Sequence, residues 1–149
     1  MFDATNFSDK LTEQMLLHDY SVEELSKTLG VSQATIYNFK KGRYKQPNTN
    51  IFFSIIELFQ CSSDYMLGFL EFPPEGIIYH APIRKYGTRL KELLKERNLT
   101  QQQFIDDMKI STNLAYKWFS DKSLPTIEYL IKIANYFEIS IDTLIQRTK

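Results

Sequence analysis

Apolar residues recur along this chain every three or four positions, and strict alternation of apolar and polar residues is nearly absent. This spacing is the period of a helix that buries one face, whereas strands alternate every second residue. The sequence therefore predicts an all-α protein.

Start and stop signals divide the first 68 residues into five helices. A Ser-x-x-Glu capping box at Ser21 begins the second helix, and Gly30 and Gly42 end the second and third. Pro47 excludes helix from the loop before the fourth. The five helices are expected at Phe7–Leu17, after Ser21, after Ser32, at Thr49–Phe59 and near Ser63.

The same order of signals returns in residues 86–149, about 79 positions later. A helix is expected at Arg89–Arg97, and Thr100-Gln-Gln-Gln103 repeats the capping box. The aligned pairs are Leu11 and Leu90, Ser32 and Ser111, Tyr37 and Tyr116, Pro47 and Pro125, Phe59 and Phe137, and Asp64 and Asp142. We therefore expect two tandem five-helix domains, residues 1–68 (the first unit) and 86–149 (the second unit).

Residues 69–85 connect the two units and contain Pro73, Pro74, Gly76 and Pro82, which exclude a long helix. Within this linker, residues 77–79 are apolar. We expect them to form a short extended segment that packs against a unit or pairs with a second chain.

The third helix of the first unit has two different faces. At 100° per residue, Ile36 and Phe39 fall on one side, where they would be buried. The residues on the opposite side or at the leading end are Gln33, Ala34, Tyr37, Asn38 and Lys41. Glutamine and asparagine can each bond adenine in the major groove, and an alanine methyl can meet the thymine methyl. The free face is therefore suited to reading A·T base pairs in duplex DNA.

Positive charge follows this helix at Lys40, Lys41, Arg43 and Lys45, which we call the basic cluster. These residues lie where a helix in the major groove would approach phosphates. The chain as a whole has 18 basic and 18 acidic residues, which weighs against a nucleic-acid partner. The local distribution matters more, and the basic cluster stands within an otherwise acidic unit.

Both units resemble the phage repressor and Cro-like (Xre-type) helix-turn-helix family, which has lambda-repressor-like five-helix domains. The first unit carries the resemblance in "SVEELSKTLGVSQATIYNFKKG", followed by a proline. Val22 and Ser26 depart from the family pattern, which usually has glutamine and a smaller residue there. The resemblance implies base contacts from Gln33, Ala34 and Asn38, and phosphate contacts from Arg43, Lys45, Asn48 and Asn50.

The second unit resembles the family less closely. The contacts that the resemblance implies for it are Gln101, Thr112, Asn113, Tyr116, Lys117 and Lys122. Lys109 and Asp121 replace the two glycines, and a left-handed residue other than glycine costs about 1 kcal/mol. Ile105 replaces a small residue at a helix crossing, and Asp106, Asp107 and Asp121 bring negative charge towards DNA. This unit is therefore expected either to bind DNA or to serve as a dimerisation or partner-docking surface.

Several other classes of function are disfavoured by the sequence. Cys61 is the single cysteine, so neither an intramolecular disulfide nor a cysteine metal site is expected. His18 and His80 lack partners at metal-ligand spacing, and no nucleophile or phosphate-loop motif occurs. No secretion signal or membrane-spanning segment is visible. We expect a cytoplasmic protein without catalytic activity, cofactor, metal or small-molecule substrate.

The sequence thus favours a regulator, most simply a repressor, that binds specific double-stranded DNA. Its two units could read two half-sites alone, or the chain could act as a homodimer. The alternative is a protein-interaction module, such as an antirepressor or an antitoxin-like protein, in which one or both units bind a protein.

Overall fold

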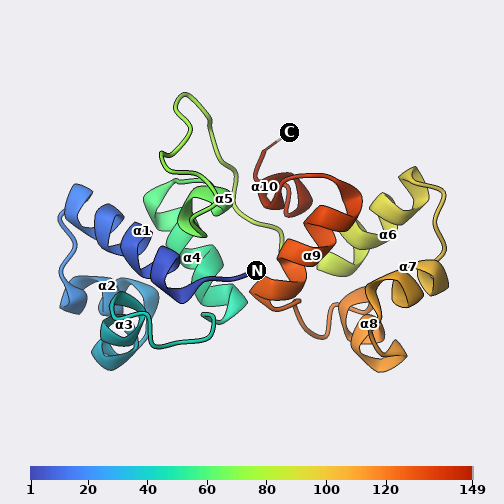
Figure 1. The fold of residues 1–149 in the computed structure, drawn as a ribbon, viewed down its shortest axis with the longest axis horizontal. Helices are drawn as coiled ribbons and strands as arrows, with labels where there is room; N and C mark the ends of the chain where they lie inside the picture. Colours follow the sequence, from blue (N-terminus) through green and yellow to red (C-terminus); the bar gives the residue numbers. More distant parts are fainter. Residues whose placement is uncertain (149) are drawn as a thin grey trace.

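The structure, a computed structural model, describes residues 1–148 and has helices but no strands over that part of the chain (Figure 1). Its helices are α1 Ala4–Leu17, α2 Val22–Leu29, α3 Gln33–Lys40, α4 Thr49–Phe59, α5 Ser63–Met66, α6 Tyr86–Glu96, α7 Gln101–Met108, α8 Thr112–Phe119, α9 Ile127–Phe137 and α10 Ile141–Leu144. The prediction of an all-α protein with two tandem five-helix domains is confirmed. Lys149, the last residue assigned to the second unit, lies outside the described residues.

The predicted helix caps are formed. Ser21 Oγ accepts from the Glu24 backbone N–H, and the Ser21 N–H donates to the Glu24 carboxylate. Thr100 and Gln103 make the same reciprocal pair at α7. These contacts satisfy backbone groups that the first turn of a helix leaves without partners, and they fix where α2 and α7 begin.

The first helix of each unit begins three residues before the position that the sequence suggested. α1 begins at Ala4 because the Asp3 carboxylate accepts from the Asn6 N–H, a local cap that the sequence analysis missed. α6 begins at Tyr86, although its N-cap residue Lys85 makes no side-chain capping bond.

Each unit has its own apolar core. In the first unit, α1 packs against α3 and α5, and α2 packs against α3 and α4. Ile36 and Phe39 are both buried there, so the predicted inner face of α3 is confirmed. In the second unit, α6 packs against α7 and α8, around Trp118 and Phe104.

The two turns of the second unit that have no glycine keep the backbone conformation of the corresponding turns in the first unit. Lys109 and Asp121 have φ values of 55° and 59°, close to those of Gly30 and Gly42 at 70° and 65°. The second unit therefore retains the helix-turn-helix geometry at a local conformational cost.

One helix crossing differs between the units. Ser26 is buried on α2, which packs closely against α3, whereas the half-buried Ile105 stands at the corresponding place on α7. α7 and α8 approach each other less closely. The distance between packed helices depends on the size of the side chains at the contact, and isoleucine is larger than serine.

The linker loops away from α5 and returns along the second unit (Figure 1). The His80 N–H donates to the Arg147 carbonyl at 2.8 Å, and the Ile83 N–H donates to the Ile145 carbonyl at 3.1 Å. Tyr79 is buried, while Ile77 and Ile78 remain exposed. The expected extended segment thus packs, through its last residue and the residues after it, against its own chain.

The two units lie side by side, with α4 and α9 near the middle of the molecule (Figure 1). α3 and α8 lie towards its two ends, and both are at the same edge. Among the described residues, no helix is both long and apolar enough to cross a membrane.

Candidate nucleic-acid interface

α3 is anchored on its inner side and leaves a polar face free. Ser32 caps its first turn by accepting from the Thr35 N–H, and Ser8 Oγ on α1 donates to the Lys40 carbonyl at its other end. Gln33, Ala34 and Tyr37 are exposed, with Tyr37 at 50%. Because both of its ends are held, α3 can present its first turn and its polar face to a partner while it stays packed in its domain.

Asn38 is half-buried, unlike its three neighbours on the free face. Its backbone carbonyl accepts from the Arg43 N–H at 3.0 Å, and this bond helps to close the turn that ends α3. The loop that carries the basic cluster is therefore fixed to the same helix.

The basic cluster follows directly. Lys41, Arg43 and Lys45 are exposed, and Lys40 is half-buried. None of the four forms an ion pair within residues 1–148. Their positive charge is thus uncompensated by the protein and available to an anionic partner.

The start of α4 carries the two remaining candidates of the first unit. Asn48 caps the helix by accepting from the Asn50 N–H at 2.8 Å, and Asn50 Oδ1 accepts from Arg84 Nη1 at 2.7 Å. Arg84 comes from the linker, and its guanidinium also lies over the Phe53 ring, 5.3 Å from the centroid. The sequence analysis missed Arg84 as a charge beside this helix start, although the Arg84-Lys85 pair was a visible signal.

In the second unit, α8 presents a comparable free face. Thr112, Asn113 and Lys117 are exposed, as is Tyr116 at 57%. Lys122 lies over the Tyr116 ring with its Nζ atom 4.8 Å from the centroid. Gln101, at the start of α7, is exposed as well. Within the described residues, the six candidate positions of this unit are accessible at the surface.

Asp121 has a structural partner that the sequence did not indicate. Its Oδ1 atom accepts from the Gly87 N–H at 2.6 Å and so supplies the cap that Lys85 does not. A Cβ atom at Gly87 would collide with the Phe119 carbonyl, so this close approach requires glycine. The negative charge of Asp121 is thereby engaged with the start of α6, where the helix dipole favours it.

Asp106 and Asp107, the other two acidic residues expected near DNA, also have hydrogen-bond partners. Asp106 accepts from Gln102 Nε2 at 2.9 Å, and Asp107 accepts from the Tyr136 hydroxyl at 2.7 Å. Partial burial, together with this bond to a carboxylate, raises the pKa of Tyr136 to about 12. The tyrosine therefore keeps its proton and donates to Asp107.

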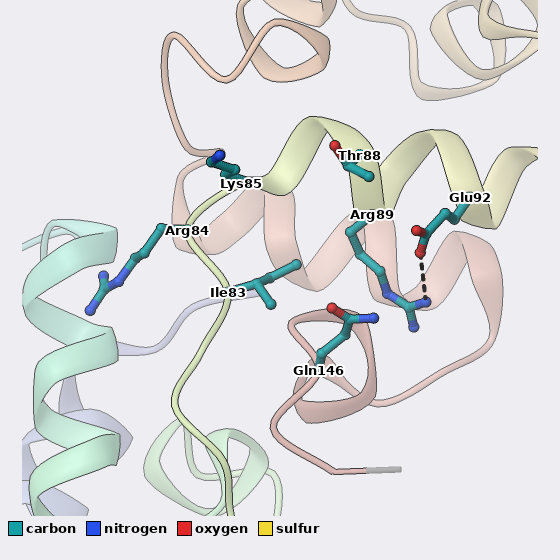
Figure 2. Close-up of a pocket in the computed structure, with 7 residues that line it drawn as sticks. All are labelled: Ile83, Arg84, Lys85, Thr88, Arg89, Glu92 and Gln146. Atoms are coloured by element: carbon teal, nitrogen blue, oxygen red, sulfur yellow. Dashed lines mark ion pairs between the residues drawn. The ribbon is translucent and has the colours of Figure 1, made fainter.

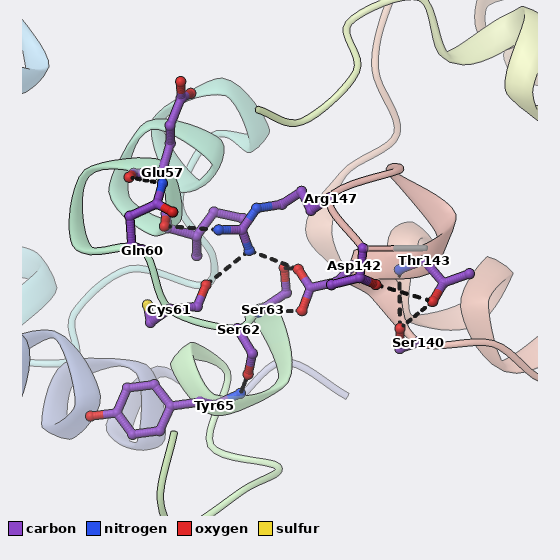
Figure 3. A network of polar contacts seen from close by, with 12 residues as sticks. Glu57, Gln60, Cys61, Ser62, Ser63, Tyr65, Ser140, Asp142, Thr143 and Arg147 are labelled. Atoms are coloured by element: carbon purple, nitrogen blue, oxygen red, sulfur yellow. Dashed lines mark hydrogen bonds and ion pairs between the residues drawn. The ribbon is translucent and has the colours of Figure 1, made fainter. Parts of the chain in front are cut away.

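A buried polar network joins the two units (Figure 3). The Asp142 carboxylate accepts from the Ser63 N–H at 3.0 Å and from Ser63 Oγ at 2.7 Å. Arg147, which is 0% exposed, pairs with Asp142 at 2.7 Å. Its guanidinium also donates to the carbonyls of Cys61 at 2.8 Å and Ile56 at 3.0 Å.

The network also encloses Cys61 and part of the linker. Burial raises the pKa of the Cys61 thiol to about 12, so the free cysteine stays protonated. The Tyr79 ring covers the Arg147 guanidinium, with the Cζ atom 4.5 Å from the ring centroid. The linker thus closes the network on one side.

A pocket of about 380 Å³ lies where the linker, α6 and α10 meet (Figure 2). Its lining residues are Ile83, Arg84, Lys85, Thr88, Arg89, Glu92 and Gln146. Arg89 donates to the carbonyls of Thr143 and Leu144, and Arg84 bonds Asn50. Two of the basic groups in this pocket are therefore occupied with the protein itself. No cluster of residues suited to hold a metal ion occurs within residues 1–148.

Two family matches cover most of the chain. A family described as "Helix-turn-helix" matches residues 11–66, and one described as "Helix-turn-helix domain" matches residues 87–149. Each match includes one of the two free helices, α3 or α8.

Two curated proteins are similar to part of the chain. The cryptic phage CTXphi transcriptional repressor RstR of Vibrio cholerae serotype O1 is 44% identical over 63 residues, which are 42% of this chain and 56% of the relative. The HTH-type transcriptional activator BcrR of Enterococcus faecalis is 33% identical over 61 residues, or 41% of this chain and 30% of the relative. The match thus spans about half of the first relative and less of the second. No solved structure matches the chain.

Proposed function

Because the chain belongs to the phage repressor and Cro-like (Xre-type) helix-turn-helix family, with two tandem copies of the domain, we propose that it regulates transcription by binding specific sequences in double-stranded DNA. The observation that carries the proposal is the free polar face of α3 beside an unpaired basic cluster. In the first unit, bases would be read by Gln33, Ala34, Tyr37 and Asn38, and phosphates bound by Lys40, Lys41, Arg43, Lys45, Asn48 and Asn50.

Each part of this surface has a distinct chemical task. The amides of Gln33 and Asn38 suit the donor and acceptor edge of adenine, and the Ala34 methyl suits thymine. The basic cluster would hold the backbone and release counterions without reading sequence. Specificity is therefore assigned to α3 and most of the salt-dependent affinity to the loop after it.

The test is selection of bound duplexes from a random DNA pool with the full-length protein at moderate salt, followed by sequencing. We expect enrichment of one sequence family that includes A·T pairs where α3 would lie. The matched control is the same protein with Lys41, Arg43 and Lys45 replaced by alanine, which should recover little DNA. A pool that stays random with the unaltered protein would reject the proposal.

We propose repression rather than activation as the regulatory outcome. A small DNA-binding protein that covers a promoter excludes the polymerase without needing a further surface. RstR is by name a repressor, whereas BcrR is by name an activator. Transcription in vitro from a promoter that contains the selected site should fall as the protein is added. A rise would assign activation instead.

A second candidate function is docking of a protein partner, as in an antirepressor or antitoxin-like protein. Two observations favour it. The net charge is zero, and five apolar residues of the linker are exposed: Phe69, Leu70, Phe72, Ile77 and Ile78. The two functions differ in their response to salt. DNA affinity that falls steeply between 50 and 200 mM salt supports phosphate contacts, whereas a flat response favours the docking function.

A further inference from the structure

The contacts between the two units fix their relative orientation. At one end of their interface, Thr49 Oγ1 donates to the Pro125 carbonyl at 2.6 Å, and Gln46 Oε1 accepts from the Glu128 N–H at 3.0 Å. At the other end, α5 packs against α10, and Arg147 and Asp142 form the buried network with Ser63 (Figure 3). Buried hydrogen bonds have preferred directions, so both ends together resist sliding and rotation of one unit on the other.

This interface is suited to two unlike partners. In the internal repeat, Arg147 corresponds to Phe69 and Ser63 corresponds to Ile141. Two first units joined in the same way would place Phe69 where the guanidinium satisfies the carbonyls of Cys61 and Ile56. Two second units would place Ile141 where Ser63 Oγ bonds the carboxylate. The first unit therefore fits the second unit better than either unit fits a copy of itself.

The same arrangement leaves both candidate reading helices free. α3 and α8 are at one edge of the molecule, towards opposite ends, and the interface lies between them (Figure 1). Dimeric helix-turn-helix proteins place two such helices in successive major grooves on one face of the duplex. Here one chain supplies both helices.

The two free faces differ in their chemistry. α3 offers Gln33, Ala34 and Asn38, which suit A·T pairs. α8 offers Thr112, Asn113 and Lys117 at the corresponding positions, and a lysine suits the O6 and N7 acceptors of guanine. The two helices would therefore not select the same base sequence.

We propose that a single copy of this chain binds a composite DNA site of two unlike half-sites, one read by α3 and one, which includes a G·C pair, read by α8. This inference rests on the proposed DNA-binding function. It assigns DNA reading through α8 to the second unit, which packs against the first unit of the same chain through α10.

The test uses the full-length protein and a duplex recovered by selection from a random pool. The mass of the complex is measured by sedimentation, and single base pairs are then changed across the site. We expect one chain per duplex and two different half-sites with centres roughly 10 base pairs apart. Two chains on an inverted repeat of identical half-sites would overturn the inference while leaving the DNA-binding function intact. A pool without enrichment would reject both.

Variants assign each half-site to a helix. Asn38→Ala should weaken binding about five- to a hundredfold and relax preference in one half-site only, and Lys117→Ala should do the same in the other half-site. Lys95→Ala, on the exposed surface of α6, is the matched control for loss of one positive charge and should leave both preferences unchanged. If Lys117→Ala behaves like Lys95→Ala, α8 does not read DNA and the inference is wrong.

Discussion

Asn38 and Lys45 occupy different environments and should contribute to DNA binding in different ways. Asn38 is half-buried on α3, and Lys45 is exposed in the loop after it. Asn38→Ala should cost about 1–3 kcal/mol of binding free energy and relax specificity at one base pair. Lys45→Ala should weaken all sequences similarly and reduce the salt slope by about 1. Titrations with single-base variants at several salt concentrations measure both, and an equal loss on every sequence from Asn38→Ala would contradict its assigned role.

Asp64 gives the protein a pH-dependent term in its stability. Burial raises the pKa of this carboxyl, and the nearby Asp142 carboxylate raises it further. The folded state thus favours the protonated form, so this contribution is full below the unfolded pKa of about 3.9 and is lost as pH rises through the folded pKa. Asp64→Asn should therefore increase the free energy of unfolding at pH 7 and bring little gain at pH 3.

Urea unfolding across this pH range measures the effect. Asp9→Asn, on the exposed surface of α1, is the matched control for loss of one carboxylate. A gain from Asp64→Asn that is the same at pH 3 and pH 7 would show that the charge of Asp64 is not the cause.

At the residue scale, the sequence predicted what depends on neighbours along the chain. The burial of Ile36 and Phe39 followed from the helical period, because both lie on one side of α3. The partners of Asp121 and Arg147 did not, because Gly87 and the carbonyls of Ile56 and Cys61 are brought to them only by the tertiary fold. The DNA contacts assigned to single residues stay predictions.

At the scale of the helix, Asp121 links the end of α8 to the start of α6. Its side chain caps Gly87, and its own backbone is left-handed at φ 59°. Asp121→Gly should lose the cap, a cost of about 0.5–2 kcal/mol, but relieve about 1 kcal/mol of backbone strain. Asp121→Ala should lose the cap and keep the strain.

Alanine is therefore expected to be the least stable, about 1 kcal/mol below glycine, and aspartate and glycine should lie within about 1 kcal/mol of each other. Urea unfolding of the three proteins measures this order. Equal stability of the glycine and alanine variants would contradict the left-handed conformation at this position.

Helix starts were predicted at several local caps, although the equally local Asp3 cap of α1 was missed. Ser21, Ser32, Thr100 and Ser111 each accept from a backbone N–H three residues later, so their signal lies within one turn. The start of α6 was misplaced because its cap comes from Asp121, 34 positions away in the sequence. Partners that are distant in the sequence leave no local pattern. For this reason the sequence did not decide whether the linker packs against its own chain or pairs with a second chain.

For the whole molecule, the main polar connection between the units is made by Asp142 and Arg147 of the second unit, which bond Ser63, Cys61 and Ile56 of the first. Arg147→Met should destabilise the protein by about 3–5 kcal/mol, because it leaves the Asp142 charge buried without its cation. The double variant Arg147→Met with Asp142→Asn should be more stable than the single variant, since asparagine is neutral and still accepts from Ser63.

A double-mutant cycle in urea measures this coupling. We expect a single unfolding transition for the unaltered protein and a separation of the transitions of the two units in Arg147→Met. Costs of the two substitutions that simply add would contradict the role of the pair.

The repeat predicted that there are two units, but not how they meet. The contacts that join them connect residues 76 to 91 positions apart, and no short pattern in the sequence marks such partners. Asp142 was noted only as the counterpart of Asp64, and Arg147 was not singled out. Its importance follows from complete burial between two units, which only the assembled fold provides.

The presence of both units in one polypeptide also affects how a promoter would respond to the amount of the protein. A repressor that must first pair with another copy responds to its own abundance with a threshold, because the active species grows as the square of the free subunit. A chain that carries both DNA-reading units does not need to dimerise before it binds. On the proposed repression by a single copy of the chain, promoter silencing would rise hyperbolically with the amount of the protein.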